Sequence, residues 1–455
     1  MARIAPFQPY RYTSAAGELR NLVTQPYDKI SPEMQAAYLA ASPYNLVRVI
    51  LGQSQADDTP ADNVYTRAAG YLQAWIRDGV LARDAAPAIY PYFQSFADPE
   101  TGVAMVRKGF IALGALEPYD AGVVHRHELT LSGPKKDRSQ LLRATRAHFG
   151  QIFMLYSDAE RAVDAVLEEV ALAPPLADVT DEYGVLHQIW CITDASLIAH
   201  IRDSMASRKL VIADGHHRYE TALAFQQESG ANHVMMTFVN TQSPGLRILA
   251  THRVLRNLAG FDTERLLQAL STGGVVERVA DDAALKVALD AVPAGELAVG
   301  VVAAGASALV RAPAGATGLG VDYLHGTLLP ALGIEAEAVR DEHFLKYVRG
   351  VDKAIQEVRQ GGAQAAFLLR PSSPEQVMEI SLGGGVMPQK ATDFYPKLLP
   401  WLLSGSLFSN GIAGEQVDTV SVARGFSGAC VSPGSGIVAC YAVHLAESDI
   451  CIAVS

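Results

Sequence analysis

Apolar residues follow both helical and strand-like patterns in the first part of the chain, residues 1–118. Between 63 and 78 they recur every three or four residues, which predicts an amphipathic helix. Three other runs, rich in β-branched and aromatic residues, predict strands: 44–51, 88–96 and 107–113. A turn at 99–102 joins the last two, so we expect them to pair as a hairpin.

The second part, residues 119–256, shows a strand, a glycine turn, a helix and a strand in succession. The short apolar run 209–213 predicts a strand that ends at Asp214-Gly215. The next residues predict a helix over 216–229, closed by Gly230, and then a strand over 233–239. Further predictions in this part are a helix from Pro134 toward Gly150 and a strand over 183–193. The order is that of a β-α-β unit, which places a helix N-terminus beside a ligand.

The third part, residues 257–400, again alternates the two patterns. It predicts helices at 263–270, 283–292 and 352–359, and strands at 297–302 and 365–369. Residues 401–455 form a Gly/Ser-rich tail without a clean period, which we expect to be atypical or weakly ordered. We therefore predict a mixed α/β (α+β) protein with four segments: 1–118, 119–256, 257–400 and 401–455.

The composition and net charge indicate which classes of binding partner the protein can have. The 455 residues are 49% hydrophobic and 19% charged, which suits a globular protein, and the net charge is −11. The chain has no Lys/Arg block of the kind that binds duplex DNA, so nucleic acid is not the expected main partner. The N-terminus lacks the apolar region of a signal peptide, and no apolar run reaches membrane-spanning length. No Cys-x-x-Cys pair indicates a zinc site or a disulfide framework, so we expect a cytoplasmic protein. The acidic net charge leaves small anionic metabolites open as partners.

Two predicted helices begin with cationic side chains, where the helix dipole disfavours positive charge. Lys135, Lys136 and Arg138 open the first of these helices. His216, His217 and Arg218 follow Gly215 in the second. A bound phosphate explains both arrangements, because it would contact the helix amides and the cations together. The alternative interpretation is two solvated first turns.

The Asp214–Arg218 turn has several possible roles. Asp214 can hold Mg²⁺, orient a histidine, act as a base, or simply cap the helix. His216 and His217 point about 100° apart on a helix, so we expect only one to face a ligand. Arg218 offers a planar fork suited to phosphate.

A second cluster, His125 to Thr130, contains Glu128. It follows a short apolar run, so Glu128 is predicted at a strand end or in the loop after it. A glutamate there can take a proton from a substrate hydroxyl if burial adjusts its pKa. The alternative is a surface loop joined by a salt bridge to Lys135 or Lys136.

The string Ile212 to Leu223 is similar to the phosphate-binding signature of the ParB/sulfiredoxin superfamily. Its Asp-Gly-His-His-Arg form most resembles the free-serine kinases of that superfamily. The resemblance implies a ParB/sulfiredoxin-like central domain that binds ATP or ADP with Mg²⁺. It implies that Glu128 is the base on a hydroxyl, that Asp214 is a metal or substrate ligand, and that Gly215, His216, His217 and Arg218 contact phosphate.

The chain to about residue 400 also resembles an uncharacterised bacterial and archaeal family, domain of unknown function 1015. The matching stretches occur in order along the sequence: Ala5–Phe7, Gln25–Asp28, Ser42–Asn45, His127-Glu128, Lys136–Arg138, Asp214–Leu223, Thr251–Arg253 and Met387–Lys397.

These patterns lead to a nucleotide-dependent phosphotransferase that acts on a small hydroxylated metabolite, with free L-serine as the first candidate. We expect Glu128, Asp214 and His217 to be catalytic, and Lys135, Lys136 and Arg138 to steady the transferred phosphoryl group. A nucleotide-binding switch of the ParB type with little turnover, and a phosphatase of a phosphorylated metabolite, are the alternatives.

Overall fold

The computed structural model describes residues 1–400, apart from 129, 131, 341–342 and 389, together with 405–406. The expected tail at 401–455 therefore lies almost entirely outside the described residues. The described residues group as one compact unit. The mixed α/β class is confirmed, whereas the likeness of the central segment to ParB/sulfiredoxin proteins stays a prediction.

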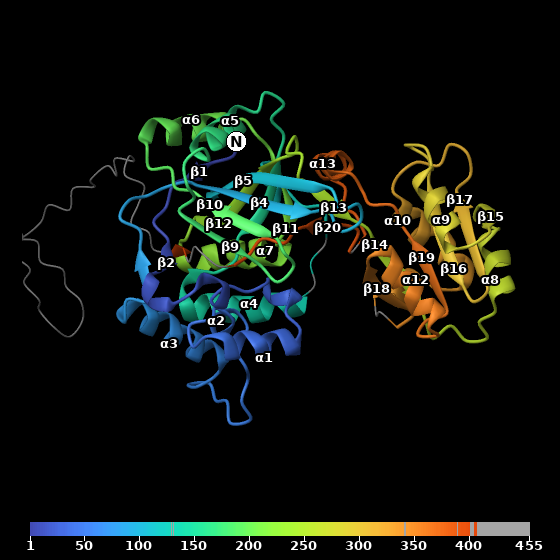
Figure 1. The fold of residues 1–455 in the computed structure, drawn as a ribbon, viewed down its shortest axis with the longest axis horizontal. Helices are drawn as coiled ribbons and strands as arrows, with labels where there is room; N and C mark the ends of the chain where they lie inside the picture. Colours follow the sequence, from blue (N-terminus) through green and yellow to red (C-terminus); the bar gives the residue numbers. More distant parts are fainter. Residues whose placement is uncertain (129, 131, 341–342, 389, 401–404, 407–455) are drawn as a thin grey trace, which may run out of the picture. The chain divides into compact units, whose positions relative to one another are not determined.

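The larger sheet among the described residues has nine strands and draws on both of the first two segments (Figure 1). In spatial order its main path is β6 (Val124–His125), β11 (Leu210–Asp214), β8 (Ile152–Tyr156), β12 (His233–Asn240), β5 (Ala104–Ala115), β4 (Tyr90–Ala97), β10 (Leu186–Ile189) and β9 (Ala177–Thr180), and β1 (Ile4–Ala5) pairs with β5. The predicted hairpin is confirmed, because β4 and β5 pair antiparallel. The boundary expected at 118 falls between two strands of this one sheet, β5 and β6.

The smaller sheet has six strands among the described residues, all paired antiparallel: β15 (Val275–Val279), β17 (Ala306–Arg311), β16 (Ala298–Ala303), β19 (Ala365–Leu368), β14 (Thr251–Leu255) and β18 (Leu345–Arg349). Three two-stranded ribbons complete the strands: β2 (Tyr10–Tyr12) with β3 (Leu81–Arg83), β13 (Arg247–Leu249) with β20 (Asp393–Tyr395), and β7 (Ala147–His148) with β21 (Gly405–Ser406). The ribbon β13–β20 matters for the site, because it pairs residues just before β14 with the 393–395 segment.

Some helices pack onto these sheets, and others pack mainly on one another. The helices of the first two segments are α1 (Pro32–Ala41), α2 (Val47–Ile50), α3 (Val64–Arg77), α4 (Ser132–Thr145), α5 (Ala162–Val170), α6 (Ala195–Ala206) and α7 (His216–Ser229). Those of the third are α8 (Thr263–Leu270), α9 (Asp282–Asp290), α10 (Gly320–Tyr323), α11 (Ala336–Arg340), α12 (Val351–Arg359) and α13 (Pro374–Leu382). Figure 1 shows α5 and α6 side by side, and α9 and α12 share one apolar cluster with strands of the smaller sheet.

Most of the predicted helices and strands are present. The helix predicted over 63–78 is α3, whose N-cap Asn63 accepts hydrogen bonds from two first-turn amides. The glycine-flanked helix predicted over 216–229 is α7, and Gly230 closes it in the left-handed conformation. The elements predicted over 257–400 are also found, as α8, α9, α12, β16 and β19.

The strand predicted over 44–51 is wrong, because this segment contains the short helix α2. Asn45 is fully buried, and its side-chain oxygen accepts the Val47 N–H at 2.9 Å. Its amide nitrogen donates to the Asn21 carbonyl at 2.8 Å. This local bonding starts a helical turn in spite of the β-branched residues.

Two further expectations need correction. The strand predicted over 183–193 is shorter, because Asp181 accepts the N–H groups of Tyr183 and Val185 and forms a turn ahead of β10. The unit β11–α7–β12 is not a parallel β-α-β unit. β11 is antiparallel to β8 and β12 is parallel to it, so β11 and β12 run in opposite directions with β8 between them.

Candidate functional site

The turn from β11 into α7 is the centre of the candidate site. The buried strand residues Leu210 to Ala213 bring Asp214 to the end of the sheet. Gly215 follows with φ +99°, a conformation that glycine adopts far more easily than other residues. Gly215 is the N-cap residue and makes no side-chain hydrogen bond to the first turn of α7. The helix therefore presents its first amides and the positive end of its dipole beside Asp214, which is an arrangement that binds anions.

Asp214 is held between two cations. Its Oδ2 lies 2.9 Å from Lys397 Nζ, and its Oδ1 lies 3.4 Å from the Arg218 guanidinium. Burial favours the neutral acid, but Lys397 and then Arg218 outweigh it and keep the pKa of Asp214 well below its usual value. Lys397 also contacts Asp393 Oδ1 at 3.1 Å. Asp214 is therefore ionised, and its charge is already balanced.

Lys397 owes its position to polar residues of the large sheet. Gln94 donates a hydrogen bond from its side chain to the Lys397 carbonyl at 2.9 Å. Arg107, which is 1% exposed, donates to the carbonyls of Tyr395 and Pro396, and burial lowers its pKa to about 10. These two residues of β4 and β5 fix the end of the 387–397 segment beside β11, and they act as positioning residues.

Glu128 lies in the loop after β6, as predicted, and faces the same cavity as Asp214. Its Oε1 accepts the Lys390 backbone N–H at 3.3 Å. Burial raises the pKa of Glu128 above its ordinary value, and this hydrogen bond only partly opposes the shift. A carboxylate with a raised pKa beside an anion-binding turn has the chemistry of a general base.

Two neutral histidines hold the Glu128 loop against α7. His127 donates from Nδ1 to the Ile212 carbonyl at 2.7 Å and accepts at Nε2 from the Thr392 hydroxyl at 2.8 Å. The His127 backbone N–H donates to His216 Nε2 at 3.4 Å. Burial lowers the pKa of His127 to about 4 and that of His216 well below its ordinary value. The His216 side chain is therefore committed to positioning this loop, and what it can offer a phosphate is its backbone N–H.

His217 and Arg218 both line the cavity. His217 is part-buried, and burial lowers its pKa, with nearby Lys135 acting in the same direction. The Arg218 guanidinium folds back over the turn and donates to the Gln151 carbonyl, besides its ion pair with Asp214. A Cβ placed on Gly215 would lie 3.1 Å from Arg218 Nη2. Arg218 thus lies directly beside the glycine turn.

The structure does not bring the cluster at the start of α4 into the same cavity. Lys135 forms an ion pair with Glu220, and Lys136 is exposed. Neither side chain lines either of the two cavities described below. Arg138 pairs with its neighbour Asp137, and its guanidinium lies 4.1 Å from the centre of the Tyr27 ring. The alternative interpretation of Glu128, a surface salt bridge to Lys135 or Lys136, is not found among the described residues: Lys135 pairs with Glu220, and Glu128 faces the cavity.

The cavity around the turn has a volume of about 520 Å³ and is strongly charged. Seven lysine and arginine side chains line it against four carboxylates. The cations are Lys29, Arg218, Lys346, Arg349, Lys353, Lys390 and Lys397, and the carboxylates are Asp28, Glu128, Asp214 and Asp393. The excess of positive charge suits an anionic ligand.

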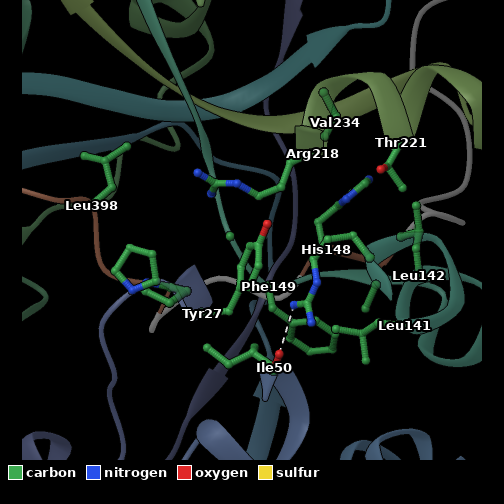
Figure 2. A pocket seen from close by; sticks show the side chains of 15 residues that line it. Tyr27, Ile50, Leu141, Leu142, His148, Phe149, Arg218, Thr221, Val234 and Leu398 are labelled. Carbon is green, nitrogen blue, oxygen red and sulfur yellow. Dashed lines mark hydrogen bonds between the residues drawn. The ribbon is translucent and has the colours of Figure 1, made fainter. Parts of the chain in front are cut away.

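A smaller and more apolar cavity adjoins the first. Its volume is about 70 Å³, and Tyr27 and Arg218 line both cavities. Figure 2 shows Arg218 together with the apolar side chains of Ile50, Leu141, Phe149 and Leu398 around this space. A ligand bound at the Gly215 turn therefore has apolar protein surface on one side and cationic surface on the other.

The residues present do not form a Mg²⁺ site of their own. Among the described residues no group of three or more His, Cys, Asp or Glu side chains could hold a metal ion. Both oxygens of Asp214 already face cations, and those of Asp393 face Lys397 and Arg349. Mg²⁺ is commonly bound by one or two carboxylates and the phosphates of a substrate. We therefore assign no chemical step to a metal held by the protein.

The sequence patterns missed Lys397 as the partner of Asp214, along with the roles of Asp393, Arg107 and Arg349. The family-like stretch Met387–Lys397 was the signal for Lys397, and it could not show which carboxylate the lysine would meet. Arg349 follows no motif, and it reaches the site because it pairs with Asp393 at 2.6 Å.

Substitution of Gly215 by alanine is expected to destabilise the protein by about 1 kcal/mol, because an L-residue is strained at positive φ. It should also weaken the thermal stabilisation by an anionic ligand such as inorganic phosphate, since the new Cβ meets Arg218. Gly230→Ala is the matched control: Gly230 has φ +72° at the other end of α7, and a Cβ there meets nothing within 4 Å. Urea unfolding should show similar losses for both variants. Loss of ligand response in both would contradict a specific role for the turn.

The fold and site together define a mixed α/β protein with a cationic cavity lined by a glycine-led helix and by Glu128 and Asp214. The chain belongs to the family described as "Protein of unknown function (DUF1015)", whose model matches residues 4–327. No curated protein matches the sequence significantly.

Three similar solved structures have low TM-scores. A conserved hypothetical protein from Pyrococcus furiosus is 15% identical with a TM-score of 0.35, over 63% of this chain and 92% of that chain. A free serine kinase in complex with AMP is 16% identical with a TM-score of 0.35, over 63% and 89%. SbnI with a C-terminal truncation, from Staphylococcus aureus, is 10% identical with a TM-score of 0.35, over 66% and 90%. The assignment of function therefore depends on the geometry of the chain itself.

The described part of the chain contains no helix that is both long and apolar enough to cross a membrane.

Proposed function

We propose that the protein is a nucleotide-dependent phosphotransferase that acts on a small hydroxylated metabolite. The observation that carries the proposal is that Glu128 and the glycine-led start of α7 line one cationic cavity. The amides after Gly215 and the Arg218 guanidinium bind nucleotide phosphates. The smaller, apolar cavity beyond Arg218 packs against the nucleoside. Its volume is about 70 Å³, so its side chains must move apart to admit a nucleobase.

Glu128 removes the proton from the acceptor hydroxyl as its oxygen attacks the terminal phosphorus. The bond from that phosphorus to the bridging oxygen breaks, and the shortened nucleotide leaves with the electron pair. Lys397 and Arg218 offset the negative charge of the transferring group, while Asp214 holds both cations in place. Phosphoryl transfer depends mainly on such positioning and charge neutralisation.

Free L-serine is the first acceptor to test, because the Asp-Gly-His-His-Arg motif resembles that of free-serine kinases. The assay combines the protein with ATP or ADP, Mg²⁺ and L-serine, and follows phosphoserine by mass spectrometry. Thermal shift with each nucleotide measures binding separately, since a ligand at 100 times its Kd adds about 2.7 kcal/mol. Binding without turnover over a panel of hydroxylated acceptors would favour the switch, and phosphate release without nucleotide would favour the phosphatase.

The pH dependence of kcat/KM should report Glu128. A general base works only when deprotonated, so kcat/KM should rise with pH through the Glu128 pKa and then level off. Because burial raises that pKa, the acid limb should lie above the ordinary glutamate value. Asp214 stays ionised over this range, because its pKa is depressed. In Glu128→Gln the residual rate should lose this limb, and a limb that persists in the variant would assign it to another group.

A further inference from the structure

One wall of the cavity comes from the smaller sheet and plays no part in the glycine turn. β18 contributes Lys346, Tyr347 and Arg349, and the first turn of α12 contributes Lys353. Within β18, Arg349 lies opposite Thr251 of β14, and Tyr347 lies opposite Arg253. We call Lys346, Arg349 and Lys353 the β18–α12 wall. The proposed phosphate site uses Lys397 and Arg218, so it gives these three further cations no role.

The three cations of the β18–α12 wall differ in their ion pairs with carboxylates. Arg349 pairs with Asp393 at 2.6 Å, and Lys346 pairs with Glu357 of α12. Lys353 is exposed and lines the cavity. Its neighbour Asp352 already pairs with Lys286, and its other neighbour, Ala354, is buried in the core. Of the three, Lys353 can therefore turn toward a ligand without breaking either ion pair that fixes the wall.

Glu128 connects this wall to the glycine turn. The Lys390 backbone N–H donates to Glu128, while its Nζ lies 4.2 Å from the centre of the Tyr347 ring. The proposed base thus lies between α7 and β18. Consider an acceptor whose hydroxyl contacts Glu128 and faces the phosphate at α7. The rest of that acceptor then lies on the other side of Glu128, next to Tyr347 and the β18–α12 wall.

We infer that the acceptor carries an anionic group, a carboxylate or a phosphate, and that the β18–α12 wall binds it, with Lys353 as a specificity-determining residue. This inference rests on the proposed function, because it uses the placement of the acceptor hydroxyl at Glu128. It names the substrate class as an anionic hydroxylated metabolite and excludes neutral polyols as good acceptors. The charge is bound away from the reacting atoms, so its binding can be measured separately from the chemical step.

The test is calorimetric titration of the full chain with three probes that share a three-carbon skeleton: glycerol, D-glycerate and sn-glycerol 3-phosphate. The wild-type protein should bind the better of the two anions at least about tenfold more tightly than glycerol. The anion that binds more tightly shows whether the wall prefers a carboxylate or a phosphate. In Lys353→Gln the affinity for the preferred anion should fall about fivefold, and in Lys353→Glu further, while the affinity for ADP stays unchanged. Lys209→Gln, an exposed lysine before β11, is the matched control and should change nothing.

Equal affinity for all three probes would overturn the inference. An equal loss of ADP and anion affinity in Lys353→Gln would also overturn it, because the wall would then hold the nucleotide. If the anion binding depends on Gly215 and not on Lys353, the probe occupies the helix start and the inference is again wrong. Failure of the proposed function is distinct: it would appear as anion binding that depends on Lys353 in a protein without ADP binding or phosphoryl transfer.

Discussion

Replacement of Glu128 by glutamine is expected to slow phosphoryl transfer by about 10²- to 10⁴-fold, the usual contribution of a positioned general base. The substitution keeps the shape of the side chain and an oxygen that can accept the Lys390 N–H. It removes only the ability to take up the proton of the acceptor hydroxyl. The expected kinetic pattern is a fall in kcat with little change in the KM for nucleotide, measured by steady-state assay with ATP or ADP.

The matched control for this variant is Glu160→Gln, because Glu160 is exposed and lines neither cavity. It should retain the wild-type rate. Thermal shift with ADP should be equal in the wild type and in Glu128→Gln, since the phosphate contacts are intact. If Glu128→Gln turns over at the wild-type rate, another group accepts the proton and the assignment of the base is wrong.

The second large effect is expected from Lys397→Met, which leaves Asp214 and Asp393 with one cation fewer each. Loss of one member of a buried ion pair commonly costs about 3–5 kcal/mol, because the remaining charge is still desolvated. Since the Asp214 side chain is 32% exposed and retains Arg218, we expect a smaller loss, about 2 kcal/mol. Urea unfolding measures this loss, and nucleotide-dependent activity should fall in the folded variant.

A double variant separates folding from function. Asp214→Asn removes the charge that Lys397 balances, so Asp214→Asn combined with Lys397→Met should lose less stability than the two single changes together predict. Activity should not return, because the cation that faces the transferring phosphoryl group is still missing. Recovery of full activity in the double variant would show that Lys397 serves only to stabilise the fold.

The part of the site that could be predicted from the sequence is encoded locally. The apolar run before Asp214, the glycine after it and the closing Gly230 are sufficient to predict β11, the turn and α7. They do so because strand burial, positive φ at glycine and helix capping act over a few residues. The position of Glu128 after a short strand was predictable for the same reason.

The rest depends on contacts between distant segments. Lys397 reaches Asp214 across 183 positions, and Arg107 holds the carbonyls of Tyr395 and Pro396 across nearly 290. No local period indicates which of several lysines will meet a carboxylate. The β18–α12 wall likewise exists because β18 pairs with β14, about ninety residues earlier in the chain.

The short helix α2 shows the opposite case, a local pattern that other contacts override. Its Val and Ile residues favour a strand, but the buried Asn45 side chain binds both the Val47 N–H and the Asn21 carbonyl. The hydrogen bonds of one polar residue therefore decide the local structure, and hydrophobic periodicity does not record them.

The most direct test of the account is a crystal structure of the protein with ADP and Mg²⁺. We expect the terminal phosphate of ADP at the N-terminus of α7, about 3 Å from the backbone nitrogens that follow Gly215. Arg218 should contact it, and Glu128 should face it across the cavity. A nucleotide bound elsewhere, with the turn at Gly215 closed by the protein's own side chains, would contradict the account.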